Sequence, residues 1–154
     1  MHAYAIFKAL FGQLLLEEKN GALTRLGFSK EKPSPEAENR ETELLQRASE
    51  QLAEYFAGKR KAFSLPLAPE GTEFQKTVWR ALEAIPYGET CSYKDIANGI
   101  GNPNGCRAVG LANGKNPIAI IIPCHRVIGT NGKLTGFGGG LDVKQYLLTL
   151  EKKA

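Results

Sequence analysis

The sequence is poor in side chains that bind metals or form disulfides. It has three cysteines and two histidines in 154 residues. Cys91, Cys106 and Cys124 are odd in number and lack Cys-x-x-Cys spacing, which argues against a disulfide framework and a zinc knuckle. A closed zinc site needs four ligands, which the sequence barely supplies. We therefore expect no metal site.

Long apolar segments are also missing. No run approaches the roughly 20 residues that a membrane helix needs, and residues 1–6 lack the basic-then-apolar pattern of a signal peptide. The apolar content of 42% is nevertheless typical of a folded globular protein. We expect a cytoplasmic protein with no membrane segment.

Acidic residues are scarce in the second half of the chain. The whole chain has 20 Lys and Arg against 16 Asp and Glu, a net charge of +4. After Tyr93 only Asp95, Asp142 and Glu151 are acidic, whereas eight residues are Lys or Arg. Such a surplus permits a polyanionic partner without requiring one. Any nucleic-acid face is expected in this half.

The first part of the chain predicts a hairpin, a linker and a helix. Residues 13–19 and 22–28 are strand-length segments joined by Asn20-Gly21, a pair that favours a tight hairpin turn. Residues 29–39 contain Pro33 and Pro35 and predict a surface linker. Apolar residues at helical spacing between positions 44 and 56 then predict an amphipathic helix that ends near Gly58.

Two capping-box patterns mark later helix starts. The first begins at Thr72, and its helix is expected to bury Trp79 and a stripe formed by Phe74, Val78, Leu82 and Ile85. The second begins at Ser92 and opens a short helix to about residue 100, followed by a break and another helix over about 105–114. This is the layout of a helix-turn-helix over about residues 92–115. Most such pairs merely pack, so the small residues of the second helix fit either close packing or approach to a nucleic acid.

Reactive groups follow an apolar run. Residues 118–122 predict a buried strand that ends at Pro123-Cys124-His125-Arg126-Val127. A thiol becomes nucleophilic as the thiolate, so Cys124 needs a nearby base or positive charge. Because neighbouring residues on a strand point to opposite faces, His125 serves Cys124 only if the chain turns or a water relays the proton. The dipeptide alone favours a buried structural cysteine.

The surrounding motifs resemble those of the O6-alkylguanine-DNA alkyltransferases. Pro-Cys-His-Arg-Val resembles that family's active-site motif, and the similarity is dense over about residues 67–151. The accompanying segments are Gly71-Thr72-Glu73-Phe74-Gln75, Val78-Trp79, Ile85-Pro86-Tyr87-Gly88, Ser92-Tyr93, Arg107-Ala108-Val109-Gly110, Asn116-Pro117, Gly139-Gly140-Leu141 and Lys144. The resemblance implies an α/β (α+β) fold: a small ribonuclease-H-like domain over residues 1–65, then a mostly helical alkyltransferase domain over 66–154 that contains the helix-turn-helix and motif 123–127.

The same resemblance implies catalytic roles. Cys124 would be the alkyl acceptor, His125 a base acting through water, and Glu151 the carboxylate that orients the imidazole. Tyr93 would donate a proton or hydrogen bond to the departing guanine, and Asn116 would brace the turn that carries the cysteine.

It also implies a DNA face and a substrate pocket. Arg107 would fill the space left by a flipped nucleotide, with the second helix in the minor groove. The residues expected to contact DNA are Arg107, Tyr93, Ala108, Gly110, Ala112, Asn113, Lys115 and Arg126. The residues expected to line the pocket are Val127, Phe137, Gly138 and Gly139. Many relatives have tyrosine where Phe137 stands and some have serine where Gly138 stands, which bears on the range of alkyl groups.

The function implied is DNA repair by direct damage reversal in a single turnover. The monomeric protein would move an alkyl group from O6-alkylguanine in duplex DNA, with O4-alkylthymine as a second candidate substrate, to Cys124 without metal or organic cofactor. A non-catalytic relative that only binds alkylated DNA is the alternative, although such proteins usually replace the acceptor cysteine. A cysteine hydrolase would leave Arg107 unexplained, and a plain transcription regulator would leave Cys124 unexplained.

Overall fold

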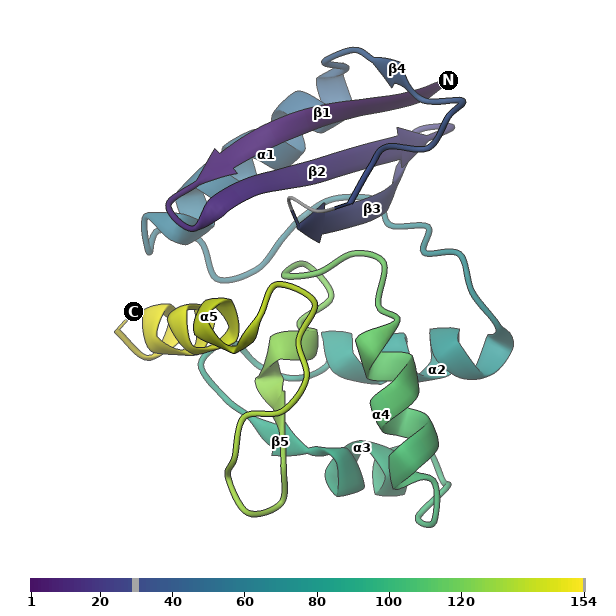
Figure 1. Cartoon of the computed structure of the whole chain (residues 1–154), viewed down its shortest axis with the longest axis vertical. Coiled ribbons are helices and arrows are strands. Elements are labelled where there is room, and N and C mark those ends of the chain that lie inside the picture. Colours follow the sequence, from purple (N-terminus) through teal and green to yellow (C-terminus); the bar gives the residue numbers. More distant parts are fainter. Residues whose placement is uncertain (29–30, 154) are drawn as a thin grey trace.

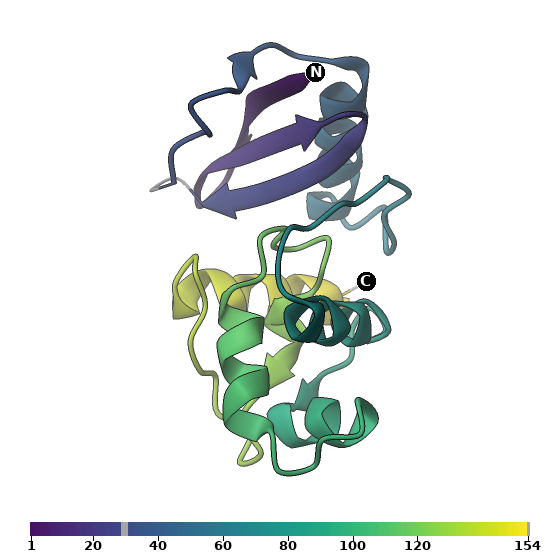
Figure 2. The same cartoon turned by 90° about the vertical axis from the view of Figure 1, so that its right-hand side faces the viewer.

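The computed structural model describes residues 1–28 and 31–153, which form a sheet-containing part and a mostly helical part (Figures 1 and 2). The predicted linker over 29–39 begins at two residues, Ser29 and Lys30, that lie outside the described ones. Ala154 at the end of the predicted second domain also lies outside them. No helix in the described ranges is long and apolar enough to span a membrane.

The sheet has four strands in the order β3-β2-β1-β4. Strands β1 (His2–Ala9), β2 (Gly12–Lys19) and β3 (Ala22–Phe28) form an antiparallel meander, and β4 (Glu38–Asn39) pairs parallel with β1. The predicted hairpin is confirmed: Asn20 and Gly21 have φ of 53° and 85°, values that this pair tolerates. Sequence patterning did not predict β1.

Helix α1 (Glu43–Phe56) confirms the predicted amphipathic helix. Its N-cap is Thr42, whose hydroxyl accepts from the backbone of Leu45. The buried face of α1, including Leu45, Leu52 and Tyr55, packs into the core beside the sheet (Figure 1). This places Tyr55 on the side of the sheet part that faces the rest of the chain.

The helical part begins with α2 (Glu73–Glu83), α3 (Tyr93–Gly99) and α4 (Cys106–Gly114). Both predicted capping boxes are present, at Thr72 and at Ser92. The indole of Trp79 donates to the Ala112 carbonyl at 2.9 Å and ties α2 to α4. The prediction that Phe74 belongs to the buried stripe was wrong. Phe74 is 36% exposed at the start of α2, one turn before the buried Val78.

The active-site segment is irregular, which corrects the predicted strand over residues 118–122. Only Ile118 makes a bridge, to Leu26 of β3. The next residues turn tightly: Ile121 donates its backbone N–H to the Ala119 carbonyl at 2.8 Å, and Ile120 has φ of 71°. Such a φ is strained for a β-branched residue. The apolar residues over 118–122 indicated burial correctly, but a buried segment need not pair as a strand.

After this turn the chain forms the 3-10 turn η1 (Cys124–Arg126) and the short strand β6 (Val127–Ile128). Strand β6 pairs with β5 (Cys91–Ser92). Helix α5 (Leu141–Lys153) is the last element of the chain. One core joins both parts. Strand β3 would otherwise be an open edge, but it bridges to Leu67 through Leu23 and to Ile118 through Leu26. The sheet part therefore directly supports the segment that carries Cys124.

Candidate active site

Cys124 begins η1, directly after Pro123, and only 6% of it is exposed. A cavity of about 450 Å³ reaches it. The lining comprises Arg25, Leu26, Phe28, Glu31, Asn113, Gly114, Lys115, Asn116, Pro117, Ala119, Cys124, Gly136, Phe137 and Gly138. Burial raises the pKa of the Cys124 thiol, and the nearby Asn116 and Lys144 only partly oppose this effect. The thiol is therefore protonated at rest and needs a base to become a nucleophile.

His125, the next residue, is fully buried and has its two ring nitrogens in different environments. Its Nε2 lies 2.7 Å from Oε2 of Glu151, while Nδ1 has no hydrogen-bond partner among residues 1–28 and 31–153. Burial lowers the pKa of His125 below its ordinary value, against the opposing effect of Glu151, so the ring is neutral. An ionised carboxylate on Nε2 selects the tautomer with the proton there, which leaves a free lone pair on Nδ1.

Glu151 of α5 is the centre of a buried polar cluster. It accepts hydrogen bonds from the Tyr55 hydroxyl at 2.6 Å, from Nε and Nη2 of Arg126 at 2.8 and 3.1 Å, and from the Gly88 backbone at 3.2 Å. Burial alone would raise the pKa of Glu151, but hydrogen bonds from His125 and Arg126 outweigh it and bring the pKa to about 2. The carboxylate is ionised at neutral pH.

Two side chains brace the backbone around Cys124. Asn116 donates to the Ile122 carbonyl at 2.8 Å and accepts from the Ile118 backbone at 3.0 Å, so it spans the strained turn. Lys144 is fully buried and donates to the carbonyls of Val127 and Thr135 at 2.7 and 2.9 Å. These contacts hold both chain segments that flank the cysteine.

A second cavity of about 820 Å³ adjoins the first and opens beside the helix pair. It is lined by Tyr93, Lys94, Cys106, Arg107, Gly110, Gly114, Gly129, Thr130, Thr135, Gly136, Phe137 and Gly138, four of which also line the cavity at Cys124. The Tyr93 hydroxyl lies 2.7 Å from that of Thr135. Together the cavities connect the α3–α4 surface with the buried thiol.

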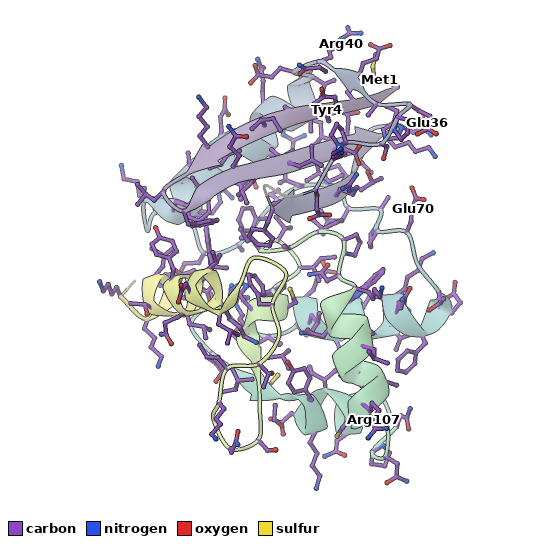
Figure 3. All side chains as sticks on the ribbon, viewed as in Figure 1. Met1, Tyr4, Glu36, Arg40, Glu70 and Arg107 are labelled. Carbon is purple, nitrogen blue, oxygen red and sulfur yellow. The ribbon has the colours of Figure 1, made fainter. Side chains whose placement is uncertain are left out.

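Helix α4 presents some of the predicted DNA-contacting residues outward. Arg107 and Ala108 are exposed on it, and Lys115 is exposed at its end. Figure 3 shows Arg107 at the end of α4 that lies away from the sheet. Gly110 and Tyr93 line the cavity beside this surface. A polyanion that approached α4 would meet these residues first.

The structure places three other residues that were predicted to contact DNA inside the protein. Arg126 is 7% exposed, and its guanidinium is held by Glu151 and by the Ile85 carbonyl at 2.8 Å. Ala112 and Asn113 lie on the inner side of α4, at 3% and 4% exposure. The basic or small character of a residue does not indicate its direction on a helix or turn, which the packing fixes.

The predicted pocket residues divide in the same way. Phe137 and Gly138 line both cavities, whereas Val127 and Gly139 line neither. A Cβ at Gly139 would come within 2.8 Å of the Phe28 ring, and that ring packs against Phe137 at 5.3 Å between centroids. Phe28 of β3 therefore supports the pocket wall from the sheet part.

Sequence reasoning missed Tyr55 and Phe28. Tyr55 bonds with Glu151, which lies 96 positions later in the sequence. Helical periodicity indicated only that Tyr55 belongs to the buried face of a helix. Phe28 was recognised only as part of a strand. No local motif carries either contact, because both depend on how the two parts pack.

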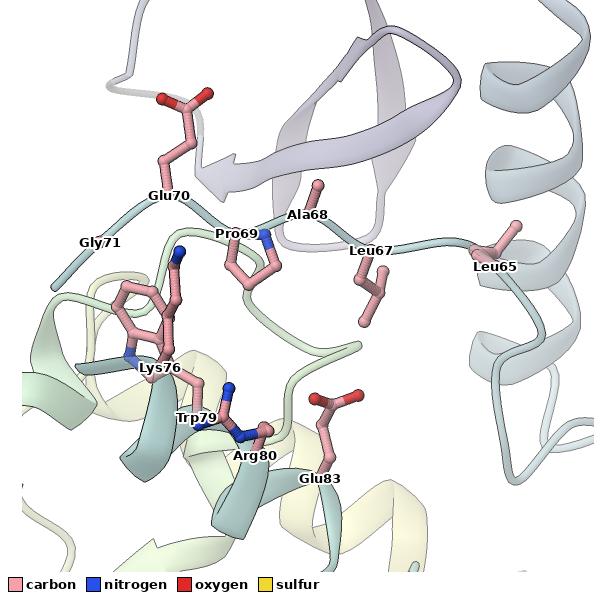
Figure 4. Close-up of a pocket in the computed structure, with 10 residues that line it drawn as sticks. All are labelled: Leu65, Leu67, Ala68, Pro69, Glu70, Gly71, Lys76, Trp79, Arg80 and Glu83. Atoms are coloured by element: carbon pink, nitrogen blue, oxygen red, sulfur yellow. The ribbon is translucent and has the colours of Figure 1, made fainter. Parts of the chain in front are cut away.

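Another hollow, of about 910 Å³, lies between residues 65–71 and α2 (Figure 4). It contains no residue predicted for the active site. Its walls are formed by Leu65, Leu67, Ala68, Pro69, Glu70, Gly71, Lys76, Trp79, Arg80 and Glu83. Across residues 1–28 and 31–153, no three His, Cys, Asp or Glu side chains gather in a group suited to a metal ion.

Comparison with known proteins covers nearly the whole chain. Residues 3–69 match the ribonuclease-like domain of 6-O-methylguanine DNA methyltransferase, and residues 73–153 match its DNA binding domain. These matches confirm the predicted fold class. The chain is 56% identical over 151 residues to a methylated-DNA–protein-cysteine methyltransferase of Methanosarcina acetivorans, covering 96% of this chain and 97% of the relative. A constitutive protein of that name from Bacillus subtilis is 46% identical over 159 residues, covering 99% and 96%.

A solved structure also resembles this chain over almost its whole length. The crystal structure of Mycobacterium tuberculosis OGT in complex with DNA superposes with a TM-score of 0.92 at 47% identity, covering 98% of this chain and 93% of that one. Three findings agree with one another: the family matches to both parts, the relatives of about 50% identity over the full length, and this superposition. The chain belongs to the 6-O-methylguanine DNA methyltransferase family.

Proposed function

We propose that this protein repairs DNA by taking the methyl group of O6-methylguanine onto Cys124. The observation that carries the proposal is the arrangement at the inner end of the cavity. Cys124 lines that cavity, and the next residue is a neutral histidine whose Nδ1 has no partner in the described part of the chain. A buried carboxylate holds the other ring nitrogen. The family relatives are named for methyl transfer from DNA to cysteine.

The first step is removal of the thiol proton. A water between Sγ of Cys124 and Nδ1 of His125 would relay that proton to the imidazole. The Glu151 carboxylate already accepts from Nε2 and stabilises the imidazolium that forms. Because burial disfavours an isolated thiolate, ionisation of Cys124 is coupled to protonation of His125.

The second step is displacement at the methyl carbon. The Sγ–CH₃ bond forms while the O6–CH₃ bond breaks, and that bond's electron pair goes to the guanine. A proton donor must neutralise the departing base, and we assign this role to Tyr93, which lines the adjoining cavity. The thioether that remains resists hydrolysis, so each molecule reacts once.

Access to a base in duplex DNA requires that the nucleotide leave the stack. We assign Arg107, Ala108, Gly110 and Lys115 to the DNA-contacting surface, with Arg107 filling the vacated space. Phe137 and Gly138 would form one side of the base pocket. We further propose that the protein acts as a cytoplasmic monomer and that O4-alkylthymine is a second substrate. We also propose that the chain divides into two domains, residues 1–65 and 66–154.

The test is a stoichiometric repair assay. Wild-type protein, mixed in limiting amount with duplex DNA containing O6-methylguanine, should remove one lesion per molecule, as measured by nucleoside chromatography. Cys124→Ser should remove none yet retain DNA binding, while Cys91→Ser, at a cysteine that lines neither cavity, serves as the control and should remove a full equivalent. Wild-type protein that binds the duplex without restoring guanine would support the non-catalytic alternative.

A further inference from the structure

Tyr55 belongs to α1 of the sheet part but bonds with the carboxylate of α5. Its side chain is fully buried, and its hydroxyl donates to Oε2 of Glu151 at 2.6 Å. The same oxygen lies 2.7 Å from Nε2 of His125 and 3.1 Å from Nη2 of Arg126. One carboxylate oxygen thus interacts with three polar groups, one of which comes from the other part of the molecule.

We propose that Tyr55 is a positioning residue that sets the basicity of His125 through Glu151. This inference rests on the proposed function. It assigns the sheet part a direct role in proton transfer, in addition to its structural support of the active-site segment.

The physical argument concerns the shared oxygen. Each accepted hydrogen bond stabilises the ionised carboxylate. Oε2 therefore attracts each of its other donors less strongly. The phenol cannot be replaced by bulk water, because Tyr55 and Glu151 are 0% and 3% exposed. The Tyr55 ring is fixed by neighbours on other elements, with Phe63 at 5.5 Å and Tyr87 at 6.2 Å between centroids. The hydroxyl is therefore held on the carboxylate.

Other titratable or charged groups also surround the pair. Arg126 of η1 binds Glu151, Lys144 of α5 lies close enough to lower the pKa of His125, and Cys124 is adjacent in sequence. Tyr87 packs on the Arg126 guanidinium, and Lys61 lies over the same ring at 5.7 Å. None of these groups is altered when the Tyr55 hydroxyl alone is removed.

Tyr55→Phe removes that hydroxyl and preserves the ring. Oε2 then acts more strongly on His125, so the pKa of the imidazole should rise by roughly one pH unit, since a hydrogen bond to a charged group has this order of magnitude. Transfer requires neutral His125, so the acid limb of the rate should move to higher pH by the same amount. A purely structural role would lower the rate equally at every pH.

Tyr87→Phe is the matched control. Its hydroxyl is buried nearby but has no hydrogen-bond partner in the described part of the chain. Imidazole NMR is simple here because the chain has only two histidines, and His2 serves as the internal reference. Titration of wild-type, Tyr55→Phe and Tyr87→Phe proteins should raise the His125 midpoint in Tyr55→Phe alone. The pH profile of methyl transfer is recorded on the same samples.

Identical His125 titration in all three proteins would overturn the inference, even if Tyr55→Phe were slower or less stable. The NMR measurement does not depend on transfer. Failure of wild-type protein to repair DNA would therefore refute the proposed function separately, while the titration still tests the connection between Tyr55 and His125.

Discussion

Replacement of Glu151 by glutamine perturbs the buried cluster at its centre. The side chain keeps its size but loses the charge that balances the Arg126 guanidinium, which is 7% exposed. Removal of one partner from a buried ion pair typically costs about 3–5 kcal/mol. The pKa of Glu151 gives a similar figure: a decrease from 4.5 to about 2 corresponds to roughly 3 kcal/mol of folding free energy. We expect Glu151→Gln to lose about 3 kcal/mol at pH 7.

The pH dependence gives this prediction a second signature. Because the folded-state pKa of Glu151 is depressed, its stabilisation is fully present above about pH 4.5 and is lost as the pH falls toward 2. The free energies of unfolding of wild type and Glu151→Gln, measured with urea, should therefore converge in acid. Glu89→Gln, at an exposed loop position, is the control and should follow wild type throughout. A gap below about 1 kcal/mol at pH 7, far under the buried-pair range, would refute the reasoning.

Three further substitutions test other parts of the site. Arg107→Ala should slow transfer from duplex DNA more than transfer from free O6-methylguanine base, measured as two rate constants; equal losses would contradict the base-flipping role. Asn116→Ala removes two hydrogen bonds around the strained Ile120 and should cost roughly 2 kcal/mol in urea unfolding, with an unchanged midpoint arguing against a bracing role. Gly139→Ala places a Cβ 2.8 Å from the Phe28 ring and should cost about 1–3 kcal/mol, and Phe28→Leu in the same chain should recover part of that loss.

Local chemistry in the sequence predicted local structure well. Asn20-Gly21 predicted the hairpin because few residue pairs tolerate its backbone conformation, and Thr72 and Ser92 predicted helix starts through side chains that bond three positions away. The apolar run over 118–122 predicted burial correctly but the wrong backbone, since a turn satisfied by internal hydrogen bonds can be as buried as a strand.

The site was predictable where motif residues are neighbours in sequence. Cys124 and His125 were named from the motif, and the contact between His125 and Glu151 followed only from resemblance. The resemblance implied that Arg126 contacts DNA, but in the structure Glu151 and the Ile85 carbonyl bind its guanidinium inside the protein. Tyr55 and Phe28 come from the other part of the fold, so their roles depend on packing that no local pattern encodes.

The central claim is that Cys124 accepts the methyl group. Wild-type protein should be reacted with duplex DNA containing O6-methylguanine, digested, and examined by peptide mass spectrometry. The account predicts one added methyl group on the Cys124 peptide, with the Cys91 and Cys106 peptides unchanged. Repair of the DNA with an unmodified Cys124, or with the methyl group on another residue, would contradict it.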